Sequence, residues 1–527
     1  MPGFSSLSSQ APGARTWLQE LRQARVVSGE AAAVSAVCYD SRRVVPGALF
    51  VAVPGFEADG HDFIPEALER GAVAVLLQED RRDRWEPYVA SSRATLVAVP
   101  DTRAALATVA AAFYGHPARR LGVIGVTGTD GKTTTIHLIA TMLEAAGRPT
   151  GYLSSVEFRA GGEARLNASH MTTLEASEVQ ELLARMVAAG DRYAVIEASS
   201  HGLALHRVDE CQVDVAVFTN LSRDHLDFHG TLEEYRQAKG RLFQMLDESV
   251  QKGVPKAAVL NADDPASGEL KSLTETAVLT YGVQLDADIK ASQISCRSEG
   301  LSFEAEGLGG RFSAKVKLLG CHNVYNCLAA AAVGYSQGLS PEEIRAGLEK
   351  FEGVAGRMER MDEGQEFDVV VDIASTPKAL RNVLDVLRPV TVGRLWVVFG
   401  CAGERDVARR DGMGRVAGES ADFAVLTNED PRSEDPDAII EAIAGGLRET
   451  GRTAGKDFVR VLDRRQAIAY ALQRARPGDV VLLAGKGSEQ SIVVGREHIP
   501  WDERVVAREV LREVTGSKAS ERGRGRE

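Results

Sequence analysis

The sequence predicts an α/β fold of three domains, and two patterns carry this prediction. Residues 125–135 read GVTGTDGKTTT and lie between an apolar stretch, LGVI, and a stretch with helical spacing, IHLIATMLEAAG. From about residue 354, short apolar stretches alternate with amphipathic ones, which is typical of a doubly wound parallel sheet. A length of 527 residues also suggests about three domains, at roughly 150 residues each.

Changes in composition set the expected domain boundaries. Residues 1–118 mix short strands and helices, include the strand ALFVAV after a Pro-Gly turn, and end near the linker-like stretch GHPARR. Residues 119–353 contain the glycine-rich loop, and residues 354–515 contain the alternating pattern. Residues 516–527 are rich in charge and poor in apolar side chains, so we expect a disordered tail there.

The alternation after residue 354 predicts a Rossmann-like C-terminal domain. Its expected strands are FDVVVDIA, RLWVVFG, ADFAVLT and DVVLLAG, and its expected helices are PKALRNVLDVLR, PDAIIEAIAGGL and RQAIAYALQRA. Strands alternating with helices in this way form a parallel sheet with helices on both faces. Before this domain, NVYNCLAAAAVGYSQGL predicts an alanine-rich helix that is packed in a core.

The glycine-rich loop predicts a central P-loop nucleotide-binding domain. The usual pattern G-x-x-x-x-G-K-S/T would place glycine at Val126, but the shorter form G-T-x-G-K-T-T is intact. Backbone N–H groups at a helix N-terminus attract phosphate, and a lysine adds charge. An ordinary glycine-rich turn would leave Lys132 and the threonines after it unexplained. The expected phosphate contacts are Gly128, Thr129, Asp130, Gly131, Lys132, Thr133 and Thr134.

Polar residues follow two further strands of this domain. RYAVIEASS and VDVAVFTNLS both end in polar loops, and ligands of open α/β sheets bind beyond the carboxyl ends of strands. The polar side chains expected at this edge are Glu197, Ser199, His201, Asn220 and Asp224.

The overall composition excludes several classes of protein. A formal net charge of -12 argues against a general nucleic-acid surface. The six cysteines show no metal-binding spacing, so we expect reduced thiols in a cytoplasmic protein. The N-terminal stretch has no apolar core of signal-peptide length, and no apolar run is long enough to span a membrane. We expect a monomer that acts on small molecules.

Six stretches in the same order resemble the Mur ligases, and among them the UDP-N-acetylmuramoyl-tripeptide synthetases. They are DSRRVVPGALFVAVPG, GTDGKTTT, EASSHGL, TNLSRDHLDFHGTLEEY, GVAGRME and AGKGSE, and together they extend over nearly the whole chain. The resemblance implies a three-domain cytoplasmic ligase of peptidoglycan synthesis, and therefore of cell-wall biogenesis, cell shape and cell division.

The resemblance also implies a reaction. ATP would phosphorylate the γ-carboxylate of D-Glu in UDP-MurNAc-L-Ala-D-Glu, and the amino group of an incoming amino acid would then attack the acyl phosphate. A carboxylate is a poor electrophile, so phosphorylation supplies the leaving group, and fixed charges stabilise the transferring phosphoryl group. The products would be the amide, ADP and phosphate, with Mg²⁺ as cofactor.

The resemblance assigns the catalytic and metal-binding roles residue by residue. Lys132, Glu197, His225 and Lys239 match the catalytic set, and Thr133, Glu197, His225 and a carbamylated Lys239 match the metal ligands. Without the resemblance, His225 would more often be a structural or capping residue, because Mg²⁺ prefers oxygen. A lone lysine such as Lys239 would more often be a solvated surface residue.

Further matches concern the substrates. The ATP contacts implied are Asn323, Arg357 and Asp372, although Asn323 could equally be a helix N-cap. Arg207 suits a carboxylate because its guanidinium can pair with both oxygens. The contacts implied for the UDP-muramoyl peptide are Ser41, Thr172, Thr173, Ser199 and Arg207.

Three motifs of the C-terminal domain depart from the family pattern. The family's D-Y-A-H-T-P-D reads DIASTPK at 372–378, K-G-H-E reads KGSE at 486–489, and D-N-P-R reads EDPR at 429–432. Each hydrogen bond or stacking interaction missing from the first two motifs would cost ~1 kcal/mol, which weakens ATP binding without abolishing catalysis. We therefore expect an active ligase; a non-catalytic paralogue that binds precursor or a partner enzyme is the alternative.

The third motif concerns the incoming amino acid. In the family, the arginine of D-N-P-R pairs with the distal carboxylate of meso-diaminopimelate, and this arginine is present here as Arg432. Further matches to the family's amino-acid contacts are Arg405, Gly485 and Glu489. Asp430 replaces the asparagine, and a carboxylate beside Arg432 could neutralise it and attract a distal ammonium. We expect meso-diaminopimelate, with L-lysine, L-ornithine or another amino acid as alternatives. An amide ligase acting on a folate or a poly-amino acid is less consistent with the DSR and HMTTLEA stretches.

Overall fold

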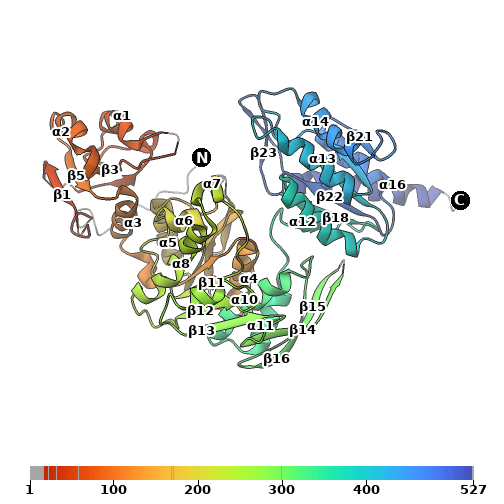
Figure 1. Cartoon of the computed structure of the whole chain (residues 1–527), viewed down its shortest axis with the longest axis horizontal. Coiled ribbons are helices and arrows are strands. Elements are labelled where there is room, and N and C mark those ends of the chain that lie inside the picture. The colour runs from red at the N-terminus through yellow and green to blue at the C-terminus, as the bar shows by residue number, and fades with distance from the viewer. Residues whose placement is uncertain are drawn as a thin grey trace. The chain divides into compact units, whose positions relative to one another are not determined.

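The structure is a computed structural model that describes residues 17–524, apart from 22, 31, 32, 57, 168, 170 and 298; the side chains of 517–524 are also outside the description. The N-terminal stretch, for which the sequence predicts no leader, lies outside the described residues, as do residues 525–527. The chain divides into two compact units. The first extends to residue 290 and adds 306–310 and 325–347; the second takes 291–305, 311–324 and 348 onward. Figure 1 labels the helices and strands described below.

A five-stranded sheet of order β1-β5-β4-β3-β2 begins the first unit. Its strands are β1 Arg25–Ser28, β2 Ala36–Cys38, β3 Ala48–Val51, β4 Ala74–Gln78 and β5 Thr95–Val99. Only β1 runs antiparallel to its neighbour, and the other pairs are parallel. The stretch ALFVAV, predicted as a strand, begins with β3, and all of its β3 residues are buried.

Helices cover both faces of this first sheet. They are α1 Ile64–Glu69, α2 Arg82–Ala90 and α3 Thr102–Phe113. One hydrophobic cluster joins Phe50 and Val75 to side chains of α1 and α2, and the other joins Leu49 and Leu76 to side chains of α3. Alternate residues of β3 and β4 therefore belong to opposite faces, as the two-residue repeat of a strand requires.

The central sheet has the order β16-β15-β14-β13-β12-β11-β6-β10-β7-β8-β9. Its strands from β7 through β10, β6, β11 and β12 to β13 are parallel, and β8 and β9 continue the edge antiparallel. The strands are β6 Gly122–Thr127, β7 Thr150–Leu153, β8 Glu157–Ala160, β9 Glu163–Leu166, β10 Tyr193–Glu197, β11 Val215–Phe218, β12 Ala257–Asn261, β13 Val278–Gly282, β14 Ile289–Arg297, β15 Gly300–Gly307 and β16 Gly310–Val316.

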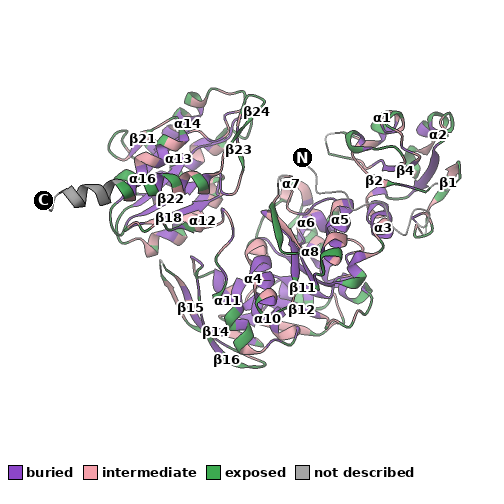
Figure 2. Ribbon diagram, turned by 180° about the vertical axis from the view of Figure 1, so that it is seen from behind, coloured by how far each residue is buried: buried purple, intermediate pink, exposed green. Residues whose placement is uncertain are grey.

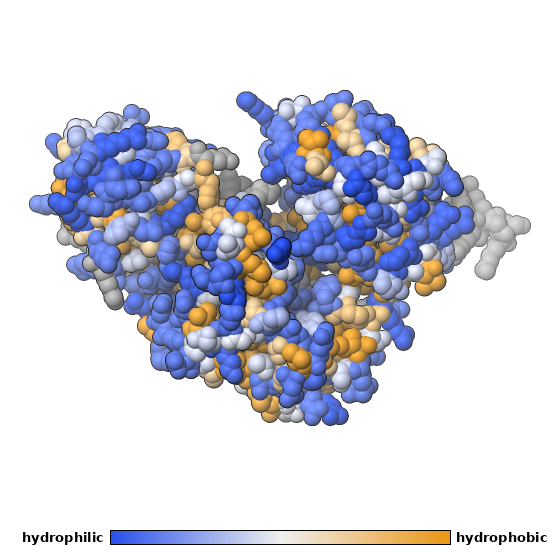
Figure 3. All heavy atoms as spheres, viewed as in Figure 1, coloured by the Kyte–Doolittle hydropathy of each residue, from blue (hydrophilic) through white to orange (hydrophobic). Residues whose placement is uncertain are grey.

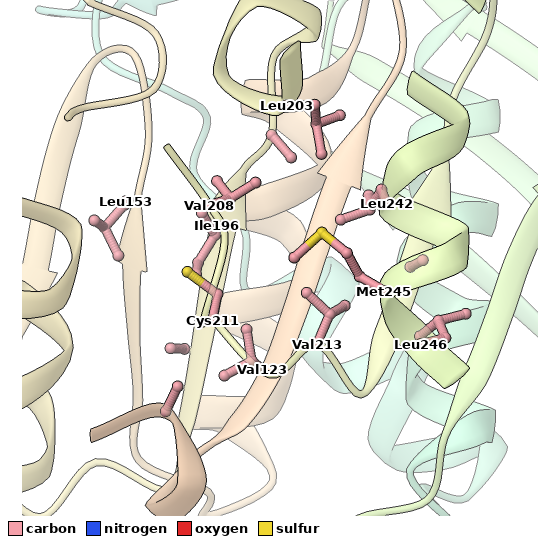
Figure 4. Close-up of a cluster of buried hydrophobic side chains, with 14 of the residues drawn as sticks. Val123, Leu153, Ile196, Leu203, Val208, Cys211, Val213, Leu242, Met245 and Leu246 are labelled. Atoms are coloured by element: carbon pink, nitrogen blue, oxygen red, sulfur yellow. The ribbon is translucent and has the colours of Figure 1, made fainter. Parts of the chain in front are cut away.

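The helices that accompany this sheet are α4 Lys132–Ala145, α5 Ala176–Ala189, α6 Ser200–Ala204, α7 Leu226–His229, α8 Leu232–Glu248, α9 Ser267–Lys271, α10 Asn323–Ser336 and α11 Pro341–Glu349. On one face, Val123 and Ile196 of the sheet pack against Leu203, Leu242 and other side chains of α6, α8 and α5 (Figure 4). The helix α4 lies against β6, β7 and β10. The central α/β prediction, including the strand–loop–helix order around residue 128, is confirmed.

The second unit contains a six-stranded sheet of order β17-β18-β22-β19-β20-β21. Every pair in it is parallel except β17 with β18, so the predicted doubly wound sheet carries one antiparallel edge strand. The strands are β17 Glu359–Met361, β18 Asp368–Asp372, β19 Leu395–Phe399, β20 Phe423–Leu426, β21 Phe458–Arg460 and β22 Val480–Ala484, followed by the hairpin β23 Ser491–Val494 and β24 Glu497–Pro500.

Helices cover both faces of this sheet as well. The side chains of α12 Pro377–Leu387, α13 Ala408–Ser420 and α14 Pro436–Glu449 share one cluster with Val397 and Leu482. Those of α15 Arg464–Arg474 and α16 Glu503–Arg524 share the other with Val398 and Val481. Purple buried residues therefore run along the strands between green, exposed helix faces (Figure 2).

Two expectations differ from the structure. The helix α16 reaches Arg524, so it continues into the segment 516–527 for which the sequence predicts a disordered tail; Ala, Lys, Glu and Arg are good helix formers. The expectation of six reduced cysteines is wrong for Cys296 and Cys321, which form a disulfide with Cα atoms 5.7 Å apart. Cys296 lies in β14 and Cys321 lies just before α10, with β15 and β16 between them in the chain. A sequence separation of 25 residues gives no signal of the pairing.

Hydrophilic side chains dominate the face seen in Figure 3, in a chain of which 26% of the residues are charged. Within the described residues, no helix is both long enough and apolar enough to pass through a membrane.

A buried ion pair stabilises the edge of the central sheet opposite the strand ends that carry the polar loops. Lys252 Nζ lies 2.7 Å from Asp214 Oδ2, and their side chains are 4% and 0% exposed. Asp214 also accepts the backbone N–H of Val123, at 2.7 Å. We expect Lys252→Met to lower the free energy of unfolding by about 3 kcal/mol, because it leaves a buried carboxylate without its cation.

Urea unfolding would measure this loss, with Lys317→Met as the control. Lys317 forms an ion pair with Glu352 whose side chains are 63% and 72% exposed, and exposed pairs contribute less than about 1 kcal/mol. Equal effects of the two substitutions would contradict the assignment of Lys252 to a buried pair.

Candidate functional site

The candidate site lies at the carboxyl edge of the central sheet. The parallel strands β6, β10 and β11 are neighbours, with Glu197 level with Val126 and Phe218 level with Thr127. The loop 128–131, the segment after Glu197 and the segment after Phe218 therefore leave the sheet at the same edge. The structure brings together here the polar residues that the sequence placed at the strand ends.

Two glycines allow the phosphate loop to pass close to its neighbours. Gly128 has φ 146° and Gly131 has φ 84°, and Gly131 caps the N-terminus of α4. A Cβ at residue 128 would lie 1.9 Å from Thr219 Oγ1, and one at residue 131 would lie 2.3 Å from Asn326 Oδ1. Neither position accepts a side chain, so the glycines follow from backbone geometry and close approach together.

Residues after β11 hold the loop in shape. Asn220 accepts the N–H of Thr129 with its carbonyl oxygen, at 2.8 Å, and the N–H of Asp130 with Oδ1, at 3.0 Å. The carbonyl oxygen of Asp130 accepts from Thr219 Oγ1 and Asn220 Nδ2, at 2.7 and 3.0 Å. The loop is therefore preorganised, and the backbone N–H groups at the N-terminus of α4 can receive an anion without rearrangement.

Lys132 and Lys239 lie on the same side of this loop. Lys132 Nζ donates to the carbonyl oxygens of Gly128 and Thr129, at 3.1 and 2.9 Å. Lys239 Nζ donates to the carbonyl oxygen of Gly128, at 2.7 Å, and lies 4.2 Å from the ring centroid of Tyr235. Lys239 is 1% exposed, so the surface-lysine alternative is wrong. Burial, with the charge of Lys132, lowers the pKa of Lys239 well below its ordinary value.

The hydroxyl of Thr133 and the carboxylate of Glu197 are in contact at the same edge of the sheet. Thr133 Oγ1 lies 3.2 Å from both carboxylate oxygens of Glu197 and 3.0 Å from Ser155 Oγ. Glu197 is 2% exposed and accepts the N–H of Ser155, at 2.8 Å. Hydroxyl and carboxylate oxygens suit Mg²⁺, which takes few protein ligands and completes its shell with phosphate and water. The described residues contain no cluster of three or more His, Cys, Asp or Glu side chains that would form a protein-only metal site.

His225 belongs to a group of aromatic rings. It has φ 51° and stands at the N-cap of α7, and its ring centroid lies 4.8 Å from that of His201. His201 stacks on Phe228 at 4.1 Å, and His229 lies 5.4 Å away. Burial, followed by the nearby His225 and His229, lowers the pKa of His201 to about 4. The imidazole of His201 is therefore neutral at physiological pH.

Arg207 and Thr173 lie beside the same edge. Arg207 pairs with Glu175 at 2.7 Å and donates to the carbonyl oxygen of Thr173 at 3.2 Å. Thr173 Oγ1 donates to the carbonyl oxygen of Glu197 at 2.7 Å and lies 2.9 Å from Ser199 Oγ. Arg103, which the sequence did not reveal, lies 4.0 Å from Glu175. Two guanidiniums share one carboxylate, which leaves positive charge for an anionic ligand.

The other expected substrate contacts are more dispersed. Thr172 is half-buried next to Thr173. Ser41 is buried and donates to Glu66 Oε2 at 2.7 Å, within the first five-stranded domain. In the second unit, Asn323 begins α10 and donates to the carbonyl oxygen of Leu319 at 2.7 Å.

Asp372 and Arg357 lie together in the second unit. Asp372 accepts the N–H groups of Met358 and Ala374, both at 2.8 Å. Burial raises the pKa of the Asp372 carboxyl, and the charge of Arg357 opposes this. The carbonyl oxygen of Asp372 accepts the N–H of Gly485 at 3.0 Å, so the DIASTPK and KGSE motifs are neighbours.

The EDPR motif adjoins the same KGSE loop. Lys486 Nζ lies 2.8 Å from Asp430 Oδ1 and 2.6 Å from Glu489 Oε2. The ion pair of Arg432 is with Glu404, at 3.8 Å. The expectation that Asp430 could neutralise Arg432 is therefore wrong, because its carboxylate is engaged by Lys486. Arg405 is exposed next to Glu404.

Glu429 is a carboxylate that the sequence did not mark. A Cβ at Gly485 would lie 2.8 Å from Glu429 Oε2, and this oxygen has no hydrogen-bond partner among the described residues. Burial raises the pKa of Glu429 to about 7, against the opposing charges of Arg464 and Lys486. Gly485 therefore leaves space beside a buried carboxylate.

The remaining omissions had weak signals in the sequence. Asn326 follows Asn323 by three residues on one helix, and Tyr235 precedes Lys239 by four, so each pair shares a helix face. Ser155 and Arg103 had no such signal, because only the folded chain brings them to the site.

A strand–glycine loop–helix unit with a buried carboxylate and a buried lysine at one sheet edge defines a phosphate-binding α/β enzyme. Three family models match the chain: Mur ligase family, catalytic domain, over residues 33–114; Mur ligase middle domain, over 126–334; and Mur ligase, glutamate ligase domain, over 356–487.

Individual relatives agree with these matches. The UDP-N-acetylmuramyl-tripeptide synthetase of Roseiflexus sp. (strain RS-1) is 46% identical over 91% of this chain and 95% of its own length. The UDP-N-acetylmuramoyl-L-alanyl-D-glutamate--2,6-diaminopimelate ligase of Geobacillus thermodenitrificans (strain NG80-2) is 43% identical over 90% and 94%. The chain belongs to the Mur ligase family, whose members form amide bonds at the expense of ATP.

Solved structures agree as well. A UDP-N-acetylmuramoyl-L-alanyl-D-glutamate--2,6-diaminopimelate ligase superposes with a TM-score of 0.65 at 30% identity, covering 93% of this chain and 97% of that one. A Mycobacterium tuberculosis folylpolyglutamate synthase shares only the fold, with a TM-score of 0.57 at 20% identity over 79% and 95%.

The close approach at Gly131 leads to a prediction. We expect Gly131→Ala to weaken ATP binding by about tenfold or more, because the new Cβ would displace Asn326 and with it the loop. Gly147→Ala is the matched control: Gly147 lies just beyond the other end of α4 with φ 71° and no atom within 4 Å of an added Cβ. Titration calorimetry with ATP would compare the two. Equal decreases in affinity would mean that backbone strain alone, and not the approach to Asn326, is responsible.

Proposed function

We propose that this chain joins meso-diaminopimelate to the D-Glu of UDP-MurNAc-L-Ala-D-Glu, with ATP as the phosphoryl donor, in peptidoglycan synthesis. The observation that carries the proposal is the preorganised phosphate loop next to Lys132, Lys239, Thr133 and Glu197. Relatives named for this reaction, identical at 43% over 90% of the chain, support the substrate.

The phosphoryl-transfer roles follow from the geometry. The amides of the loop 128–134 and the charge of Lys132 would hold the ATP phosphates, and Thr133 and Glu197 would hold Mg²⁺. Bound there, Mg²⁺ neutralises charge that develops on the phosphoryl oxygens. His225 would add to this site from the N-cap of α7. In the second unit, Asn323, Arg357 and Asp372 remain proposed contacts of ATP.

The acceptor would lie beside Thr173. Arg207 and Arg103 share the carboxylate of Glu175, and their surplus positive charge suits the γ-carboxylate of D-Glu or its acyl phosphate. Thr172, Ser199 and, in the first domain, Ser41 complete the proposed contacts of the UDP-muramoyl peptide. Transfer of the phosphoryl group breaks the terminal P–O bond of ATP and releases ADP. The amine then attacks the acyl carbon, and phosphate leaves as the amide forms.

The proposal requires an amino acid with a distal carboxylate. Asp430 is paired with Lys486, and the partner of Arg432 is Glu404, at 3.8 Å. At that distance the guanidinium of Arg432 would still offer its N–H groups to the distal carboxylate. Arg405, Gly485 and Glu489 would contact the rest of the amino acid. A cytoplasmic monomer that binds no nucleic acid fits small substrates of this kind, although the Cys296–Cys321 disulfide is unusual for a cytosolic protein.

A carbamate on Lys239 is part of the proposal. Carbamylation requires a neutral amine, and a lowered pKa means that Lys239 is neutral at a lower pH than an ordinary lysine. We expect protein in ¹³C-bicarbonate at pH 8 to show one carbamate carbonyl signal, absent from Lys239→Met. Carbon-13 NMR would detect it, and phosphate release should fall when dissolved carbon dioxide is removed.

Lys252→Met is the matched control for this experiment. The side chain of Lys252 is 4% exposed, and burial lowers the pKa of Lys252 too, but the Asp214 carboxylate 2.7 Å away opposes this and favours the ammonium form. Its removal should therefore leave the signal in place. A carbamate signal that persists in Lys239→Met would place the modification elsewhere.

The decisive experiment measures phosphate release by the purified protein with ATP, Mg²⁺ and UDP-MurNAc-L-Ala-D-Glu. Meso-diaminopimelate, L-lysine and L-ornithine are supplied separately, and the products are confirmed by mass. Release that depends on meso-diaminopimelate supports the proposal. Release with lysine or ornithine alone would correct the amino acid, and nucleotide binding without any release would indicate the non-catalytic alternative.

Arg432→Ala tests the distal carboxylate. We expect the KM for meso-diaminopimelate to rise by about tenfold or more, because a charge-assisted pair worth about 1.5–3 kcal/mol is removed. The KM for ATP should stay within about twofold of its original value. Steady-state kinetics would measure both constants, and an unchanged KM for the amino acid would remove Arg432 from the site.

A further inference from the structure

The KGSE loop contains a lysine that is completely removed from solvent. Lys486 is 0% exposed and comes directly after Gly485, beyond the end of β22. Its ammonium lies 2.8 Å from Asp430 Oδ1 and 2.6 Å from Glu489 Oε2. A buried charge is stable only when it is paired, and these two carboxylates supply the pairing.

Asp430 connects this bridge, formed by Lys486 with Asp430 and Glu489, to the hairpin β23–β24. The same oxygen that receives Lys486 accepts the N–H of Val493 at 2.9 Å. Arg432 is joined to the hairpin on both sides: its N–H donates to the carbonyl oxygen of Val493, at 3.0 Å, and its own carbonyl oxygen accepts from Gly495, at 2.7 Å. Arg432 has φ 54°, a backbone conformation that persists only when its surroundings hold it.

The other side of the loop is equally constrained. A Cβ at Gly356 would lie 2.2 Å from the backbone nitrogen of Ser488, and Gly485 donates to the carbonyl oxygen of Asp372 at 3.0 Å. The loop backbone therefore cannot shift freely. Removal of the ammonium would instead leave the carboxylates of Asp430 and Glu489 without their cation; their side chains are 13% and 29% exposed.

We propose that Lys486 is a positioning and specificity-determining residue: by bridging Asp430 and Glu489 it fixes the Arg432 turn and prevents Asp430 from neutralising Arg432. The proposal rests on the proposed function, because it assigns Arg432 to a distal carboxylate of the amino acid. Aspartate is tolerated at position 430 because the buried lysine compensates its charge. Without Lys486, the released carboxylates of Asp430 and Glu489 make the surroundings of Arg432 more negative.

Steady-state kinetics of four proteins test the bridge: the original chain, Lys486→Met, Asp430→Asn and the double variant. We expect Lys486→Met to raise the KM for meso-diaminopimelate by about tenfold, with the KM for ATP changed less than about twofold. Preference should also shift towards L-lysine, which has no distal carboxylate to be repelled. Adding Asp430→Asn to Lys486→Met should lower the KM for meso-diaminopimelate again by at least about threefold, because it removes the unpaired carboxylate.

Two controls separate positioning from a general loss of structure. Lys252→Met removes another buried lysine–aspartate pair, from the central sheet, and should lower stability without a selective change in KM. Lys486→Arg keeps the charge and should retain more of the affinity for meso-diaminopimelate than Lys486→Met does.

The outcomes are decisive in each direction. An unchanged KM for meso-diaminopimelate in folded Lys486→Met, or no recovery in the double variant, would overturn the proposal. Inactivity of the original chain with every amino acid would overturn the proposed function instead. Urea unfolding of the same four proteins then decides whether the bridge exists: non-additive shifts in the unfolding midpoint support it, and additive shifts reject it.

Discussion

The phosphate loop depends on two close approaches that only glycine permits. Residue 128 passes Thr219 at the end of β11, and residue 131 passes Asn326 in α10. These approaches tie the loop to a strand on one side and to a helix nearly two hundred residues later in the chain on the other. Thr135, one turn into α4, donates to the same Asn326 oxygen at 3.2 Å. The start of α4, the loop and α10 therefore form one rigid body, and the positions of Lys132 and Thr133 follow from it.

The fixed loop holds the ammonium groups of Lys132 and Lys239 close enough to repel each other. Lys132 and Lys239 both donate to the carbonyl oxygen of Gly128, at 3.1 and 2.7 Å. Two ammonium groups on one carbonyl repel each other, and Lys239 is in addition almost fully buried, so its charged form is the less stable of the two. A neutral or carbamylated Lys239 removes the repulsion, and an anionic phosphate at the loop would lower it further. The unusual lysine is thus a consequence of the loop's geometry as much as of its own burial.

The sequence predicted those parts of the fold whose signals are local. The parallel sheet of the C-terminal domain, the loop at 128–131 and the helix after it follow from period-two and period-3.6 patterns and from glycine spacing. Contacts between distant segments were not predictable in the same way. Nothing in the sequence places Ser155 on Glu197, Arg103 near Glu175, or Cys296 beside Cys321, because each pair meets only through strand order and loop path. The antiparallel edge strand β17 was missed for a related reason: three residues are too short to show a pattern.

The charges of the EDPR motif illustrate the limit of judging a substitution by its neighbours in sequence. In the linear order, Asp430 stands two positions from Arg432, and neutralisation of the arginine is the natural inference. In the fold, the turn at Arg432 directs the two side chains to different partners: Asp430 to Lys486 and the backbone of β23, and Arg432 towards Glu404. The aspartate that replaces asparagine at position 430 adds its negative charge next to a buried cation, Lys486. The net charge available to a ligand then depends on Arg432 with its partner Glu404, and on how Lys486 is shared between Asp430 and Glu489. The aspartate at position 430 therefore alters specificity only if its compensating partner, Lys486, is also removed.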